Sequence, residues 1–157
     1  AGCRVDAAVR VSGLGGAALS APFVAACPLA LALQRHAIAT LAPAAREELG
    51  SPIVRIDHLG SFACRRVRGR PNGPLSQHAF ARALDVTGYA TADGRTIAID
   101  ADWPGTAGPT AAEGRFLRRV VARQAGWLAG PFTSVITPDR DARHRDHIHF
   151  GLRPPRR

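Results

Sequence analysis

The chain has 157 residues, the length of one domain and enough to bury a hydrophobic core without disulfide or metal support. Its formal charge is +9, and all 21 basic residues are arginine, against 12 carboxylates. Aromatic residues make up only 6% and the arginines are dispersed, which argues against nucleic acid. Arginine in place of lysine throughout, with abundant alanine, is typical of a GC-rich genome, and anionic lipid or a cell-wall polymer is the alternative explanation of the charge. No apolar run approaches the ~20 residues that span a bilayer, so we expect no transmembrane segment.

The N-terminal segment predicts a β-hairpin. Valine recurs between residues 5 and 11, a glycine-rich turn follows at 13–16, and apolar residues return at 19–25. A hairpin centred in that turn places Cys3 opposite Cys27.

Two helices and a strand are predicted next. Pro28 suits the first turn of a helix that runs to about Leu41. Residues 43–49 predict a second, short helix that ends at Gly50. The β-branched run 53–56 then predicts a strand.

The middle of the chain predicts a loop followed by a hairpin. A basic, turn-rich segment leads to His78, which we expect in a loop or a short helical turn. Residues 83–89 predict a strand that carries Asp85. The pair Asp93-Gly94 is a strong turn signal between this strand and a second one at 96–99.

The last part predicts an amphipathic helix and two strands. The capping box Thr110–Glu113 opens a helix, and its apolar face comprises Phe116, Leu117, Val120, Val121, Gln124, Trp127 and Leu128. Residues 134–137 and 147–152 predict strands. Since residues two apart in a strand point to the same face, His147 and His149 should share one side.

Together these elements predict an α+β domain in which a small antiparallel sheet is flanked by helices. We expect a single domain over 1–157, with an N-terminal hairpin at 1–27 and a loose tail at 153–157.

Two separated fragments contain metal-ligand chemistry. His78 is followed seven residues later by Asp85, and His147-Ile148-His149 comes near the C-terminus. Neither fragment is specific alone, but His, Asp and His together are ligands that suit zinc. Three protein ligands with a fourth position open to water are typical of a catalytic zinc site, where the bound water has a pKa of about 7.

These fragments resemble a known superfamily. Ser76-x-His78-x6-Asp85 with a later His-x-His is similar to the zinc peptidases that include lysostaphin-type enzymes, D-Ala-D-Ala carboxypeptidases and hedgehog domains. Within it, the chain resembles the extensin-like C-terminal domain family. The matching blocks are Cys3, Cys27-Pro28, 61–65 (Ser-Phe-Ala-Cys-Arg), 76–79 (Ser-Gln-His-Ala), 83–85 (Ala-Leu-Asp), 93–95 (Asp-Gly-Arg), Asp102-Trp103 and 146–150 (Asp-His-Ile-His-Phe). Two departures are Ala81, where these families usually have glycine, and Trp127, where a fourth cysteine is expected.

The resemblance implies a role for each site residue. One zinc ion per chain would be bound by His78, Asp85 and His149. Asp146 stands at the position of the catalytic glutamate of the dipeptidase branch, and His147 stands at that of the assisting histidine of the endopeptidase branches. Either residue could be the catalytic base, or both could act, one taking the proton of the water and the other stabilising the oxyanion.

The resemblance also implies roles for two further residues. Arg65 would hold a substrate carboxylate or the developing oxyanion, a task that suits the guanidinium fork. Ser76 would hold the His78 loop by local hydrogen bonding, without acting as a nucleophile.

The implied function is a zinc peptidase that cuts peptidoglycan stem peptides, as a carboxypeptidase or endopeptidase with a hedgehog/D-Ala-D-Ala-peptidase-like fold. An exported protein of the periplasm or cell envelope is implied, with its signal peptide absent from this chain. A non-catalytic envelope-binding module and a zinc amidase acting on a non-wall substrate are the alternatives. Export favours one disulfide over free thiols, and the hairpin register favours Cys3–Cys27, with Cys64 left over.

Overall fold

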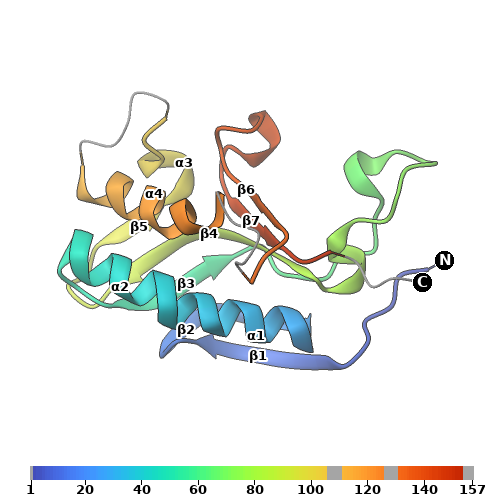
Figure 1. The fold of residues 1–157 in the computed structure, drawn as a ribbon, viewed down its shortest axis with the longest axis horizontal. Coiled ribbons are helices and arrows are strands. Elements are labelled where there is room, and N and C mark those ends of the chain that lie inside the picture. The colour runs from blue at the N-terminus through green and yellow to red at the C-terminus, as the bar shows by residue number, and fades with distance from the viewer. Residues whose placement is uncertain (1, 106–110, 126–130, 154–157) are drawn as a thin grey trace.

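The fold was obtained as a computed structural model that describes residues 2–105, 111–125 and 131–153. Within these residues the chain forms a seven-stranded sheet flanked by helices, in the order β1-β2-β3-β4-β7-β6, with β5 also paired to β4 (Figure 1). The strands are β1 (Ala8–Leu14), β2 (Ala17–Ala26), β3 (Ile53–His58), β4 (Ala83–Thr91), β5 (Thr96–Ala98), β6 (Ser134–Ile136) and β7 (Ile148–Gly151). The prediction of a mixed fold with a sheet and flanking helices is confirmed.

The sheet differs from the expected small antiparallel one in size and in one pairing. β2 and β3 run parallel, with Ala18 opposite Arg55 and Leu19 opposite Ile56, while the other described pairs are antiparallel. Parallel neighbours need a long crossover, usually a helix. The helical segment between β2 and β3 supplies that crossover.

This crossover is one continuous helical segment rather than two helices. It comprises α1 (Cys27–His36), the π-helical turn η1 (Ala37–Leu41), α2 (Ala42–Ala44) and a second π-helical turn η2 (Ala45–Leu49). The N–H of Ala42 donates to the carbonyl of Ala37, five residues back, so the helix widens just before Pro43. Gly50 ends the segment with φ +65°, as predicted.

The predicted disulfide is wrong: Cys3 is bonded to Cys64, and Cys27 is an exposed free thiol at the start of α1. The reason is a β-bulge in the hairpin. Next to the turn Gly13 pairs with Ala18, but beyond the bulge Val11 pairs with Phe23, so the register shifts by three residues.

The segment before β1 therefore leaves the hairpin. It reaches the loop that follows β3, where the two bridged Cα atoms lie 5.6 Å apart. The bridge fastens the N-terminal segment beside Ala63, whose N–H donates to the carbonyl of His78.

The core lies between the sheet and the helices. Helix α4 (Ala112–Ala125) buries Phe116, Leu117 and Val120 completely, and the Phe116 ring meets Tyr89 of β4 edge-on at 5.3 Å. Its exposed Arg115 and Arg119 face away and pair with Glu47 and Glu48 of η2. The predicted apolar face is thus confirmed for residues 116–121, while Thr110, Trp127, Leu128 and the side chain of Gln124 lie outside the described residues.

The hairpin at Asp93-Gly94 is confirmed, but its second strand is shorter than predicted. β5 ends at Ala98, and Ile99 begins the short helix α3 (Ile99–Asp102). The carboxylate of Asp102 accepts a hydrogen bond from the N–H of Ala98 at 2.8 Å, which stabilises the turn into α3. In the described part of the chain, no helix combines the length and apolar character needed to cross a membrane.

Candidate metal centre

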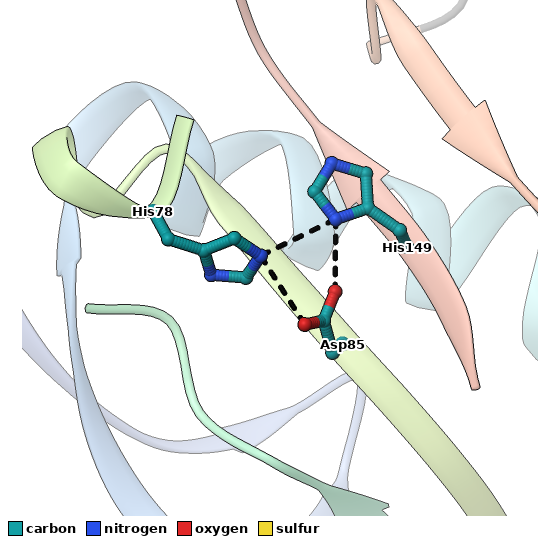
Figure 2. A group of neighbouring side chains, drawn as sticks. All are labelled: His78, Asp85 and His149. Atoms are coloured by element: carbon teal, nitrogen blue, oxygen red, sulfur yellow. Dashed lines mark hydrogen bonds and ion pairs between the residues drawn. The ribbon is translucent and has the colours of Figure 1, made fainter. Parts of the chain in front are cut away.

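Three elements bring His78, Asp85 and His149 together (Figure 2). His78 lies in the short 3-10 helix η4 (Gln77–Phe80), Asp85 in β4 and His149 in β7. Asp85 is directly opposite His149 in the antiparallel pair, and residues in that relation have Cβ atoms about 4.5–5.5 Å apart. The pairing of β4 with β7 therefore accounts for two of the three predicted ligands being neighbours.

Helix η4 places the third ligand. The Oγ of Ser76 accepts a hydrogen bond from the N–H of His78 at 3.3 Å, the local role predicted for this serine. The turn ends at Ala81, which is buried and has φ +48° and ψ +41°. This left-handed conformation costs a non-glycine residue about 1–2 kcal/mol, and glycine would adopt it without that cost.

The ligand atoms of the three side chains lie close together. The Nε2 of His78 lies 3.2 Å from Asp85 Oδ2 and 3.3 Å from His149 Nδ1, and His149 Nδ1 lies 2.8 Å from Asp85 Oδ1. A tetrahedral zinc ion about 2.0–2.1 Å from each ligand separates the ligand atoms by about 3.3 Å. All three side chains are buried. The donor set fits zinc, with two separations near the tetrahedral value and the His149–Asp85 pair closer than that value.

Hydrogen bonds on the far side of each ring define which nitrogen faces the centre. The Nδ1–H of His78 donates to the backbone carbonyl of Ser61 at 2.9 Å, so Nε2 is the nitrogen of this ring that faces the centre. The Nε2–H of His149 donates to the side-chain oxygen of Gln77 at 2.8 Å, so Nδ1 is the nitrogen of that ring that faces the centre. Such outer hydrogen bonds fix the tautomer and orientation of metal-binding histidines.

The roles of Gln77 and Ser61 were missed in the sequence. The only signal for Gln77 was its place between Ser76 and His78, and nothing in the sequence singled out the Ser61 carbonyl. Gly151 belongs to the same arrangement, because a Cβ there would clash with the Gln77 amide and lie 2.8 Å from His149 Nε2.

The electrostatics favour an ionised Asp85. Burial acts to raise the pKa of this carboxyl, but hydrogen bonds from His149 and His78 and the charges of these rings outweigh burial and hold the pKa well below its ordinary value. An ionised carboxylate is the form that binds a metal.

His147 and Asp146 lie beside the metal ligands and form a pair. His147 Nδ1 is 2.8 Å from Asp146 Oδ1, and its Nε2 is 3.9 Å from Asp85 Oδ1. Asp146 is exposed, and its hydrogen bond with His147 holds its pKa below the ordinary value. The imidazole therefore stands between the Asp146 carboxylate and the metal ligands.

Arg65 and His144 lie outside this group. Arg65 is exposed; its carbonyl accepts a hydrogen bond from the N–H of Ser76, and its side chain forms no hydrogen bond or ion pair within the described residues. The ring of His144 packs 5.1 Å from that of His147, and its Nδ1 lies 2.8 Å from Asp141 Oδ1.

Comparison with known proteins identifies one family. The family model described as extensin-like protein C-terminus matches residues 1–157, the whole chain. No curated protein and no solved structure matches the chain.

Proposed function

This chain belongs to the extensin-like protein C-terminus family, and we propose that it is a zinc-dependent peptidase that hydrolyses amide bonds in peptidoglycan stem peptides. The observation that carries the proposal is the buried His78–Asp85–His149 group, whose ligand atoms all lie within 4.8 Å of one another. Zinc in this group would supply a water with a pKa near 7 and an electrophile for the amide carbonyl. The resemblance to carboxypeptidases and endopeptidases supports amides as the substrate.

His147 is the residue we assign to proton transfer. Its Nδ1–H is held by Asp146, so its Nε2 can accept a proton on the side of the metal ligands and return it to the leaving amine. Asp146 orients the imidazole and stabilises its protonated form. The lowered pKa of Asp146 makes this carboxylate the weaker base of the two.

The cell envelope is the proposed location. A disulfide between residues 61 apart in sequence is typical of oxidising compartments such as the periplasm. The formal charge of +9 suits a surface that meets an anionic polymer. The same charge favours the second candidate, a non-catalytic module that binds peptidoglycan.

The deciding experiment is digestion of purified muropeptides by the zinc-loaded protein, with product masses read by mass spectrometry. We expect about one zinc per chain and defined cleavage products. His78→Ala, Asp85→Ala and His149→Ala should each strip the metal and abolish cleavage. Full zinc occupancy in Asp85→Ala would contradict the ligand assignment. Binding of peptidoglycan without any product, with zinc present, would favour the binding module.

A further inference from the structure

A cavity lined by arginine opens between two loops. One loop carries the short helix η3 (Val67–Gly69), and the other, between β6 and β7, carries η5 (Ala142–His144) (Figure 1). The cavity has a volume of about 310 Å³, at the lower end of the range for small-molecule sites. Its lining residues are Arg68, Arg70, Asp141, Ala142 and Arg143, and we call it the arginine pocket.

The arginine pocket carries a surplus of positive charge. Its lining has three arginines and one carboxylate, and that carboxylate, Asp141, already accepts hydrogen bonds from His144 Nδ1 at 2.8 Å and from the N–H of Arg143 at 3.1 Å. Within the described residues, the side chains of Arg68, Arg70 and Arg143 form no ion pair. By contrast, Arg55, Arg95, Arg118 and Arg119 are each paired with a carboxylate.

The backbone holds Arg68 in an uncommon conformation. Its φ of +56° and ψ of +21° are left-handed, which costs a non-glycine residue about 1–2 kcal/mol. The loop is braced from within, because Arg66 Nη1 donates to the carbonyl of Gly73 at 2.5 Å and the N–H of Val67 donates to Pro74. Strain retained in a braced loop is a feature of ligand-binding sites.

A line of contacts joins the arginine pocket to the metal ligands. Asp141 bonds to His144, the His144 ring packs 5.1 Å from that of His147, and His147 Nε2 lies 3.9 Å from Asp85 Oδ1. Two imidazole rings thus separate the pocket from the ligands. A group bound there would belong to a part of the substrate apart from the amide that is cut.

We propose that the arginine pocket binds a carboxylate that the substrate carries apart from the cleaved amide. This inference rests on the proposed function, since it names which stem peptides the site selects. Guanidinium groups bind carboxylates through paired, charge-assisted hydrogen bonds. Stem peptides contain D-glutamate, whose α-carboxylate is free unless it is amidated. The pocket therefore selects stems with the free carboxylate over amidated stems.

The test uses two fluorescein-labelled stem tetrapeptides that differ only in D-glutamate or D-isoglutamine. Fluorescence anisotropy gives the affinity of the full-length, zinc-loaded protein for each peptide, read before measurable hydrolysis. We expect the glutamate peptide to bind about tenfold more tightly, the scale of one charge-assisted hydrogen bond, and the difference to shrink with added salt. Equal affinities in the unmodified protein would overturn the inference whatever the variants do.

Two charge-matched triple variants locate the effect. Arg68→Asn/Arg70→Gln/Arg143→Gln removes the pocket's guanidinium groups, and asparagine tolerates the left-handed backbone at residue 68. The control removes three exposed arginines from elsewhere on the chain, as Arg10→Gln/Arg35→Gln/Arg46→Gln. The pocket variant should bind both peptides alike, and the control should keep the preference. Equal loss of preference in both variants would assign it to net charge and contradict the inference.

Product analysis in the same samples keeps this inference distinct from the peptidase proposal. Preference for the glutamate peptide without cleavage of either peptide supports the arginine pocket and contradicts the peptidase. Cleavage of both peptides with equal affinity and equal KM supports the peptidase and contradicts the pocket. If both hold, the pocket variant should raise KM for the glutamate peptide about tenfold and leave kcat unchanged, as expected for binding shared by ground and transition states.

Discussion

At the scale of single residues, the pair formed by Asp146 and His147 gives the proposed chemistry its clearest test. His147→Ala removes the group that we propose for proton transfer and leaves the three proposed metal ligands in place. We expect hydrolysis to fall on the order of 10²–10⁴-fold, with zinc content unchanged by metal analysis.

Asp146→Asn should act differently, because it removes a charge and leaves the imidazole in place. Asparagine can still accept the hydrogen bond from the imidazole but no longer stabilises its protonated form, so we expect kcat to fall less than in His147→Ala, with zinc content unchanged. Parental rates in both variants would refute the assignment.

Gly151 offers a second test, on the outer hydrogen bonds of the centre. A methyl group at this position collides with the Gln77 amide that holds His149. Gly151→Ala should therefore weaken zinc binding about 10–100-fold in competition with a chelator, the usual effect of disturbing such a contact. Gln77→Ala should weaken it similarly, because it removes the oxygen that accepts the hydrogen bond from His149. Parental zinc affinity in both variants would contradict this role for the outer hydrogen bond.

The residues of the centre were predictable to different degrees. His78, Asp85 and His149 were identified because their residue types and spacing match a recognisable pattern, and the structure brings them together. Gln77 was missed because its role depends on how β7 lies against η4, which spacing along the chain does not encode. The catalytic role of Arg65 stays a prediction.

At the scale of elements, the Cys3–Cys64 bridge fastens the N-terminal segment to the loop after β3. A bridge between residues 61 apart is worth about 4 kcal/mol by loop-closure entropy. We expect Cys3→Ser or Cys64→Ser to lower the free energy of unfolding by about 2–4 kcal/mol, measured by urea denaturation. Cys27→Ser is the matched control and should leave it unchanged, since Cys27 is an exposed free thiol. A large loss in the control would contradict the pairing.

Most elements followed from local patterns, and the errors have identifiable causes. The hairpins, the strand that carries Asp85 and the apolar face of α4 depend on alternation and turn residues, which the sequence displays directly. The disulfide was wrong because a bulge at Val11–Gly13 changes the register without a clear sequence signal. The break expected near Pro43 did not occur, because wider turns let the helix pass the proline.

At the scale of the whole molecule, zinc should stabilise the fold, because its ligands join three elements up to 71 residues apart. Zinc at 1,000 times its Kd adds about 4 kcal/mol to the free energy of unfolding. For a domain of this size we expect Tm to rise by roughly 8–16 °C. Calorimetry with zinc or with a chelator measures the shift, and His149→Ala should show none. A zinc-dependent shift in His149→Ala equal to that of the parent would place the metal elsewhere.

The pairing of β4 with β7 has a consequence for how the chain avoids misfolding. A slip of one residue between these strands would set Ile148 or Phe150 opposite Asp85 and turn His149 to the other face of the sheet. A slipped chain would have no place for the metal and would gain none of its binding energy. Metal binding would thus stabilise only molecules with the correct strand pairing. Molecules with the slipped pairing would be less stable and more readily degraded by proteases in the compartment where they fold.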